Sequence, residues 1–342
     1  MVDISVIVPA YNSGKQLTRC LEALSRQTVP RDNYEVIVVD DGSQDGTETV
    51  ARGFGVLVVS QAHAGPAAAR NYGVNCSTGK ILLFTDADCA PQDDWIAEMM
   101  GPFRDPQVAG VKGVYRTAQR GLVARLVQAE FEEKYARMAR ATYIDFVDTY
   151  SAGYRRSVFL DNGGFDPSFP GTSAEDVEFS FRLSQKGYKM VFAPQAIVYH
   201  SHPSSLWGYL YRKFRFSLWR AKVYARYPGK VGKDSYTPRA VPFQICFSAL
   251  LAGSLLLGLF QPPALVASLL LGVAFLLSIG PLCLRTFARD KPAALVAPPL
   301  LFLRCLVQFL GLLIGGASSL GRREARKRVL SRLLGRRTDS GG

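Results

Sequence analysis

Apolar runs and amphipathic segments alternate along the first part of the chain. The run ISVIVPAYN at residues 4–12 predicts a strand buried on both faces, because its apolar positions are nearly continuous. In the segment that follows, Leu17, Leu21 and Leu24 recur at helical spacing. Further strand-like runs come after it, each separated from the next by a helix-like segment: EVIVVDD, GVLVVSQ and KILLFTDAD. This alternation predicts an α/β fold with a mostly parallel sheet flanked by helices.

Polar residues stand where three of these predicted strands end. They are the segment PAYN at residues 9–12, the pair Asp40 and Asp41, and the segment DAD at residues 86–88. Ligands in an open parallel sheet bind beyond the carboxyl ends of the strands. We therefore expect these groups to meet at one rim and to form a ligand site there.

Common calcium and nucleotide motifs do not explain this rim. The stretch DGSQDG at residues 41–46 imitates the start of a calcium loop, but Arg52 stands where that loop needs a bidentate glutamate. Neither G-x-G-x-x-G after the first strand nor G-x-x-x-x-G-K-[ST] is present in the sequence. We therefore exclude calcium, Rossmann and P-loop modes of binding, and we interpret Asp45 and Gly46 as turn residues at a helix entry.

Asp86 and Asp88 are candidates for holding a metal ion. They are one residue apart after an apolar run, so in extended geometry both side chains point to the same side. Two carboxylates in that arrangement can share a divalent cation whose other ligands are phosphate oxygens and water. A pair of surface aspartates is common, so the position at the end of a buried strand is what gives this pair its weight.

Glu175 and Asp176 form a second acidic pair, at a predicted helix start. Thr172 or Ser173 is the expected cap of that helix. Favourable charge at a helix N-terminus would explain one acid by itself. The preceding segment GGFDPSFPG is a glycine and proline loop of the kind that lines sites.

Six segments, in this order, resemble the family 2 glycosyltransferases, which have a GT-A fold: SVIVPAYNSGKQLTRCLEALSRQ, VIVVDDGSQDGT, GPAAARNYGV, FTDADC, GGFDPSF and AEDVEFSFRL. The resemblance covers residues 4–202, and we bound the GT-A catalytic domain at residues 1–205. It implies transfer of a sugar from a nucleotide diphosphate donor, with inversion at the anomeric carbon. Nucleotidyl transfer is the nearest competing reaction, and the ED and GGFD segments favour glycosyl transfer.

The resemblance implies a nucleotide-binding role for the first strand ends. Tyr11 would stack on the base, and Pro9 and Ala10 would supply backbone around it. Asp41 would accept a hydrogen bond from the base, while Asp40 would support the loop or the ribose.

The resemblance also implies roles for the later acids. Arg70 would lie near base or phosphate, with an ordinary surface arginine as the alternative. Asp88 would bind Mg²⁺ or Mn²⁺, and Asp86 would reach the ribose or a metal-bound water. Asp176 would be the general base, with Glu175 orienting it or contacting the acceptor. This division fits the chemistry, because a cation stabilises the leaving diphosphate and a carboxylate must take the proton of an acceptor hydroxyl.

The three histidines of the chain receive different expectations. His200 follows a strand-like run and could complete the metal site, as a histidine does in several related enzymes; an exposed loop histidine is the alternative. His202 is expected to be a loop residue. We assign no role to His63, which precedes GPAAAR.

The region after the ED segment departs from the processive members of the family. Those enzymes carry Q-x-x-R-W, whereas here Trp219 and Arg220 stand in the reverse order within LYRKFRFSLWRAKVYARYPG. Transfer of a single sugar is therefore preferred over a processive polysaccharide synthase. We interpret residues 206–240 as a basic aromatic interfacial helix and linker, in preference to an RNA-binding segment. A catalytically silent nucleotide-sugar-binding scaffold is the alternative from another class.

The last hundred or so residues are strongly apolar and predict membrane association. Residues 243–260 and 264–284 are each long enough to span a bilayer, and only QPP separates them, which predicts a transmembrane hairpin at residues 241–284. The third segment, at 285–320, contains Arg304, whose charge is costly at a bilayer centre. We expect it to be re-entrant or interfacial, with three full spans as the alternative. A basic cytoplasmic tail at 321–342 completes the chain.

Charge and cysteine content bear on location. The formal net charge is +13, and the basic run at residues 322–337 directly after apolar segments favours anionic lipid over nucleic acid. The six cysteines include no C-x-x-C pair and no basic leader precedes the first apolar run, which together predict a catalytic domain in the cytoplasm. We therefore expect a multi-pass protein of the inner (plasma) membrane, with a lipid-linked or glycan acceptor and no nucleic-acid partner.

Overall fold

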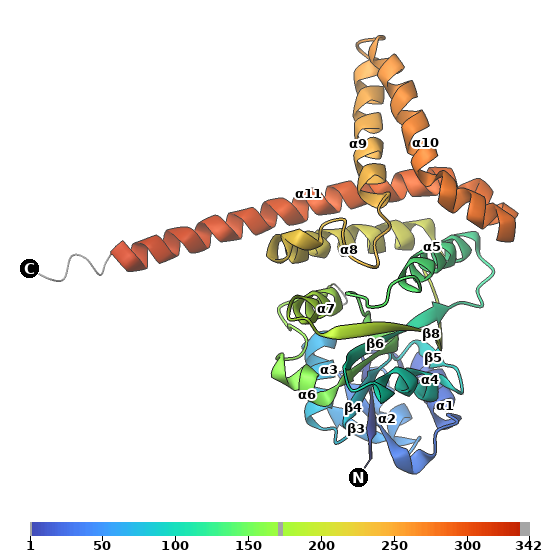
Figure 1. The fold of residues 1–342 in the computed structure, drawn as a ribbon, viewed down its shortest axis with the longest axis vertical. Helices are drawn as coiled ribbons and strands as arrows, with labels where there is room; N and C mark the ends of the chain where they lie inside the picture. The colour runs from blue at the N-terminus through green and yellow to red at the C-terminus, as the bar shows by residue number, and fades with distance from the viewer. Residues whose placement is uncertain (1, 170–173, 336–342) are drawn as a thin grey trace, which may run out of the picture.

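The computed structural model of the chain describes residues 2–169 and 174–335, with side chains as far as residue 318. Its N-terminal part is an eight-stranded mixed sheet flanked by helices (Figure 1). In the order in which they lie side by side, the strands are β3 (Leu57–Ser60), β2 (Tyr34–Asp40), β1 (Ile4–Ala10), β4 (Ile81–Phe84), β7 (Ala152–Arg155), β6 (Val108–Arg116), β8 (Lys189–His200) and β5 (Cys89–Pro91).

Strand direction divides this sheet into two parts. Strands β1 to β4 are parallel to one another, as the alternation of strands and helices predicts. Strand β7 is antiparallel to both β4 and β6, while β6 and β8 are parallel. Strand β5 pairs antiparallel with β8 at the sheet edge. The prediction of a mostly parallel α/β fold is confirmed.

The helices of the catalytic domain and of the C-terminal part follow in chain order. They are α1 (Gly14–Ser25), α2 (Thr47–Arg52), α3 (Pro66–Asn75), α4 (Trp95–Met100), α5 (Leu122–Met138), α6 (Arg156–Asp161), α7 (Glu175–Gln185), α8 (Leu206–Arg226), α9 (Val241–Gly258), α10 (Ala264–Arg289) and α11 (Lys291–Gly335). The predicted helix start at Glu175 is confirmed, and Ala174 precedes it. The expected caps Thr172 and Ser173 lie outside the described residues, as does the end of the predicted tail from residue 336.

The core between the sheet and the helices consists of the same apolar residues whose spacing predicts these strands and helices. Leu17, Leu21 and Leu24 of α1 are buried, as are the central residues of β1 and β2. Helix α3 approaches the sheet at Gly73, where a Cβ atom would lie 2.7 Å from Ile7 Cγ2 and 2.8 Å from Val39 Cγ2. Any larger residue would push α3 away from the strand ends that it serves.

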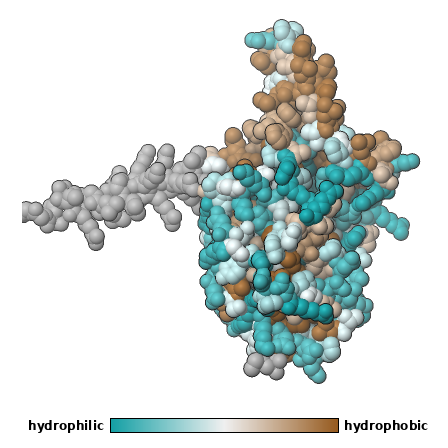
Figure 2. Space-filling model, in the orientation of Figure 1, coloured by the Kyte–Doolittle hydropathy of each residue, from teal (hydrophilic) through white to brown (hydrophobic). Residues whose placement is uncertain are grey.

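Helices α9 and α10 form an apolar hairpin that projects away from the catalytic domain, and α11 passes across its base (Figure 1). Figure 2 shows that the hydrophobic surface on this face gathers on the hairpin, whereas the catalytic domain is mostly hydrophilic. Side chains such as Leu259 and Phe260 at its tip are 76% and 83% exposed. By length and composition, three helices within the described part of the chain could cross a membrane: Val241–Gly258, Ala264–Arg289 and Lys291–Ser318.

Helix α11 also packs closely along α8. A Cβ atom on Gly311 would lie 2.6 Å from the Phe214 carbonyl oxygen, and one on Gly315 would clash with the backbone of Leu218. Two glycines four residues apart thus let the helix backbones approach, as small residues do in helix pairs. Helix α11 continues past the predicted boundary at residue 320 and reaches Gly335.

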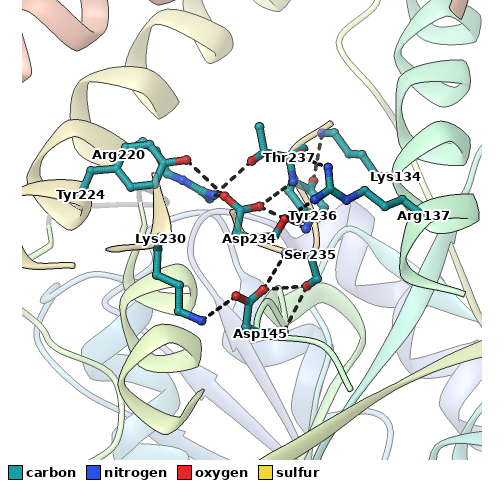
Figure 3. Close-up of polar contacts among 10 residues, drawn as sticks. All are labelled: Lys134, Arg137, Asp145, Arg220, Tyr224, Lys230, Asp234, Ser235, Tyr236 and Thr237. Carbon is teal, nitrogen blue, oxygen red and sulfur yellow. Dashed lines mark hydrogen bonds and ion pairs between the residues drawn. The ribbon is translucent and has the colours of Figure 1, made fainter. Parts of the chain in front are cut away.

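The loop between α8 and α9 is fastened to the catalytic domain (Figure 3). Asp145 accepts hydrogen bonds from the Ser235 backbone nitrogen and hydroxyl, each at 2.7 Å, and from Lys230 Nζ at 2.6 Å. Arg137 on α5 donates to the carbonyl oxygens of Thr237 at 2.5 Å and Asp234 at 2.9 Å. These contacts hold the start of the membrane hairpin against the catalytic domain.

Candidate active site

The carboxyl ends of β1 and β2 place Tyr11 and Asp41 at the predicted rim. The Tyr11 ring is 47% exposed and stacks on the His63 ring, with centroids 4.1 Å apart. Asp41 is buried, and its carboxylate accepts hydrogen bonds from the backbone nitrogens of Ala64 and Gly65, both at 2.9 Å. Asp41 therefore stabilises the loop after β3 from inside the domain. The exposed side chains at this rim are those of Tyr11 and His63.

The position of His63 at this rim is not predicted from the sequence, where it resembles an ordinary loop residue. Its Nδ1 atom lies 3.0 Å from Asp41 Oδ2 and 3.1 Å from the Asp41 carbonyl oxygen. A usable signal did exist, because β3 is parallel to β2 and its following loop must reach the same rim. Asp40 stabilises the loop after its own strand β2, where its Oδ1 accepts a hydrogen bond from the Ser43 backbone nitrogen at 3.3 Å.

Arg70 joins two of the acidic segments inside the domain. It projects from α3 and is only 1% exposed. One terminal nitrogen donates to Asp86 Oδ1 at 2.6 Å, and the other donates to Glu175 Oε1 at 3.0 Å. The alternative of a surface arginine is wrong, because burial of this guanidinium is matched by two carboxylates. Arg70 thus ties the segment after β4 to the first residue of α7.

Asp176 lies beside this cluster and lines a cavity. Burial, followed by the charge of the neighbouring Glu175, raises the pKa of Asp176 to about 7. The hydrogen bond that its Oδ1 accepts from the Val177 backbone nitrogen, at 2.7 Å, acts in the opposite direction. A carboxylate with a pKa near neutrality is suited to accept a proton under cellular conditions.

The predicted metal ligands Asp88 and His200 lie close together in the structure although they are far apart in the chain. Cys89, which follows Asp88 directly, is 111 positions before His200. The antiparallel pairing of β5 with β8 puts Cys89 opposite His200, and His200 Nδ1 then lies 3.3 Å from Asp88 Oδ1. His200 is 9% exposed at the end of β8, so the alternative of an exposed loop histidine is wrong. His202 lies in the following loop as expected, but it is buried against Gln128.

Asp88, Cys89 and His200 offer ligand atoms that lie within 4.8 Å of one another. Burial raises the pKa of Asp88, but the hydrogen bond and charge of His200 outweigh it and leave this pKa below its ordinary value. Burial, with the nearby carboxylates, raises the pKa of the Cys89 thiol well above its ordinary value. A carboxylate oxygen suits both Mn²⁺ and Mg²⁺, an imidazole nitrogen is a poor ligand for Mg²⁺, and a protonated thiol is a poor ligand for either ion.

A cavity of about 950 Å³ is lined by the residues that are predicted to bind the metal ion and to act as the base. Its lining includes Arg70, Asp86, Asp88, Glu175, Asp176 and His200. Pro9, Ala10, Tyr11, Asp40 and Asp41 do not line it and lie at the neighbouring strand ends. The same cavity extends to side chains of α9, α10 and α11, including Ile245, Leu282 and Leu312.

Several glycosyltransferases are similar to the N-terminal domain. The profile of the family described as Glycosyl transferase family 2 matches residues 5–163. Glycosyltransferase AglE of Haloferax volcanii is 33% identical over 232 residues, covering 65% of this chain and 74% of that protein. The pre-mycofactocin glycosyltransferase of Mycobacterium tuberculosis is 30% identical over 238 residues, covering 67% of this chain and 49% of that protein.

A solved structure shares the fold. The mannosyltransferase PcManGT from Pyrobaculum calidifontis, in complex with GDP-Man and Mn²⁺, matches with a TM-score of 0.56 and 22% identity, covering 93% of this chain and 86% of that one. This likeness supports the GT-A architecture of the mixed sheet and its helices. The resemblance inferred from the six segments is confirmed: the chain is a glycosyltransferase with a GT-A fold and belongs to glycosyltransferase family 2.

Proposed function

We propose that the chain transfers a single sugar, with inversion, from a nucleotide diphosphate sugar to a hydroxyl or phosphate of a membrane-held acceptor. The observation that carries this proposal is the shared cavity, which is lined by Asp88, His200 and Asp176 and also by the helices of the membrane part. A lipid-linked acceptor reaches such a site from the bilayer, and a cell-envelope glycan presented at the membrane is the other acceptor class.

The nucleotide of the donor binds at the rim formed by β1, β2 and the loop after β3. Tyr11 stacks on the base and His63 supports it from behind, because their rings already lie 4.1 Å apart. Pro9 and Ala10 supply backbone at the same strand end, and Asp40 and Asp41 hold the loops around it. Asp86 and Arg70 line the cavity, and Asp86 follows β4 next to β1, so this pair would contact the ribose and the phosphates.

The metal site lies on the donor side of the cavity. Asp88 and His200 would hold Mg²⁺ or Mn²⁺, since both ligand atoms already face one another at 3.3 Å. When bound, a divalent cation neutralises the negative charge that develops on the departing diphosphate. Asp86 is engaged by Arg70 and therefore serves the ribose or a water ligand rather than the ion itself.

Asp176 acts as the general base toward an acceptor hydroxyl. Its carboxylate takes the proton while the acceptor oxygen attacks the anomeric carbon from the face opposite the diphosphate. Glu175 cannot replace it, because Glu175 is buried and bonded to Arg70. Arg70 thereby holds the start of α7 and places Asp176 at the cavity.

We further propose that the α9 and α10 hairpin spans the inner (plasma) membrane and that α11 lies at its interface on the cytoplasmic side. Both ends of the hairpin lie at the catalytic domain, where Arg285 bonds to Glu133 and Arg289 bonds to Glu132 of α5. Arg304 of α11 bonds to Glu130 of α5 at 2.5 Å, which is compatible with an interfacial depth. The cations at the hairpin base follow the positive-inside pattern.

Release of nucleoside diphosphate tests the proposal. Full-length protein is incubated with UDP, GDP and dTDP sugars, membrane lipid extract, and Mn²⁺ or Mg²⁺. We expect release from at least one donor, with loss of nearly all activity in Asp176→Asn and full activity in the exposed control Asp32→Asn. No release from any donor by the wild type would favour a silent nucleotide-sugar-binding scaffold. Long products from one donor would favour a processive synthase.

A further inference from the structure

The cavity extends from the proposed catalytic acids to the membrane helices, and its lining includes both charged and apolar side chains. Near Asp176 and Asp88 the lining is acidic. Apolar side chains of the membrane part line the cavity as well, among them Ile245 on α9, Leu282 on α10 and Leu312 on α11. Such a volume falls in the usual range for a site that encloses a small organic ligand.

Several cations of α5, α8 and α11 also line this cavity, and three of them are neutralised by carboxylates. Lys213 and Arg304 bond to the two oxygens of Glu130, at 2.6 Å and 2.5 Å. Arg220 bonds to Asp234 at 2.8 Å. These charges have structural partners and are not available to a ligand.

Lys134 is different, because it forms no ion pair with any carboxylate in the described part of the chain. Its Nζ donates to the Tyr236 hydroxyl at 3.1 Å and lies 4.8 Å and 4.2 Å from the ring centroids of Phe131 and Tyr236 (Figure 3). Burial, together with the nearby charge of Lys213, lowers the pKa of Lys134 well below its ordinary value. A bound anion would restore the charged form of this lysine.

Arg212 on α8 is another such cation. Within residues 2–169 and 174–318 it has no ion-pair partner, and it lines the same cavity. Asp88 and Tyr236 line the same cavity as Arg212. Lys134 on α5 and Arg212 on α8 therefore line one cavity from two helices.

We propose that Lys134 and Arg212 bind the phosphate of an amphiphilic acceptor, a long-chain alkyl phosphate ester whose chain lies among the apolar side chains of α9, α10 and α11. The proposal rests on the proposed function and narrows its acceptor to an anionic lipid carrier. Arginine and lysine are suited to phosphate through charge-assisted hydrogen bonds. The apolar wall favours the chain by removing it from water. The group attached to this phosphate supplies the hydroxyl whose oxygen attacks the anomeric carbon, and Asp176 takes the proton of that hydroxyl while the nucleoside diphosphate leaves.

Direct binding by the full-length protein in detergent tests the subsite without any sugar donor. The probes are farnesyl monophosphate and farnesol, titrated by calorimetry. We expect the phosphate to bind at least about tenfold more tightly than the alcohol, and Lys134→Met and Arg212→Gln each to weaken phosphate binding by about tenfold or more. Lys134→Arg keeps the charge and should retain most of the affinity. The exposed Lys233→Met in the same loop region is the matched control and should bind normally.

Three results would overturn the subsite. Equal affinity for the two probes would show that the phosphate is not recognised. Unchanged phosphate binding in both Lys134→Met and Arg212→Gln, with thermal stability also unchanged, would show that the phosphate binds elsewhere. Equal competition by phosphatidylglycerol would make the cavity a bulk-lipid site. The two proposals can fail separately. If farnesyl monophosphate binding depends on the two cations but no nucleoside diphosphate is released, only the proposed function is refuted. If nucleoside diphosphate is released but the binding does not depend on these cations, only the subsite is refuted.

Discussion

Arg70 and Glu175 form a buried ion pair, with 3.0 Å between Nη1 and Oε1, that joins α3 to the first residue of α7. The same guanidinium holds Asp86 at 2.6 Å. Asp176 follows Glu175 directly, so the position of the proposed base depends on this arginine. The acid pair at the helix start thus divides into one structural and one chemical carboxylate.

Arg70→Met should therefore destabilise the protein and lower its activity. Removing one partner of a buried ion pair leaves the other charge unmatched, which costs on the order of 3–5 kcal/mol. Thermal unfolding of the full chain in detergent measures the loss. Arg70→Lys should recover only part of it, because lysine lacks the fork that reaches two carboxylates. The exposed Arg104→Met should be neutral, and equal stability of the two methionine variants would contradict the role of the pair.

The pH dependence of activity should follow Asp176. A base works only when ionised, so kcat/KM should rise with pH and level off above about 7, the value to which burial and Glu175 raise this pKa. Because the folded protein holds this proton more tightly than the unfolded chain, the same group lowers stability as pH rises from about 4 toward 7. A profile that is already flat from pH 5 upward would contradict the assignment.

Mn²⁺ binding should depend on Asp88 and His200. Electron paramagnetic resonance of free Mn²⁺, titrated with protein and nucleoside diphosphate, measures affinity without turnover. Asp88→Ala should abolish specific binding, and His200→Gln should weaken it by at least the roughly 10- to 100-fold that loss of an outer-shell partner costs. Cys89→Ser should bind normally, since Mn²⁺ prefers oxygen ligands to sulfur. Normal Mn²⁺ affinity in Asp88→Ala would refute the metal site.

Glu130 should prove essential for joining the catalytic domain to the membrane helices. It accepts from Tyr209 at 3.0 Å, Lys213 at 2.6 Å and Arg304 at 2.5 Å, so one carboxylate joins α5, α8 and α11. Burial raises the pKa of Glu130, but the charges of Lys213 and Arg304 lower it by more than burial raises it. The net pKa therefore lies below the ordinary value. Glu130→Ala should lower stability by about 3–5 kcal/mol, whereas Glu130→Ala combined with Arg304→Met should be less harmful than the sum. Additive losses by thermal unfolding would show that the two residues are uncoupled.

Membrane topology offers a further prediction. If α9 and α10 form the spanning pair and α11 is interfacial, the hairpin tip and the C-terminus lie on opposite sides of the membrane. A membrane-impermeant maleimide should label Gln261→Cys in intact cells and Ser340→Cys only after lysis, with the wild type showing the background of the native cysteines. Labelling of Ser340→Cys in intact cells would indicate three full spans.

Much of this fold follows from local patterns. The buried strands of the parallel half are evident from continuous apolar runs, and parallel strands must deliver their ends to one rim. Asp86 and Asp88 are therefore recognisable as candidate site residues by their place after a buried strand, and Glu175 and Asp176 are recognisable as candidates by their place at a helix start beside a glycine and proline loop. The family resemblance supplies their separate roles, which sequence position alone does not distinguish.

Other features depend on contacts that no local pattern encodes. The approach of His200 to Asp88 depends on the register of β5 against β8, and the burial of Arg70 depends on how α3 meets α7. The cations Lys134 and Arg212 resemble ordinary solvated charges in sequence, and only the packing of α5 and α8 beneath the membrane helices brings them to one cavity. Hydrophobic periodicity determines which face is buried, but it does not determine which buried faces meet.

The stereochemistry of the product tests the central claim most directly. With an α-linked donor identified by nucleoside diphosphate release, nuclear magnetic resonance of the purified product reveals the anomeric configuration. Direct displacement assisted by Asp176 predicts a β-linked product, and it predicts that Asp176→Asn forms this product at less than about a hundredth of the wild-type rate. An α-linked product, or undiminished transfer by Asp176→Asn, would contradict an inverting transfer with Asp176 as the base.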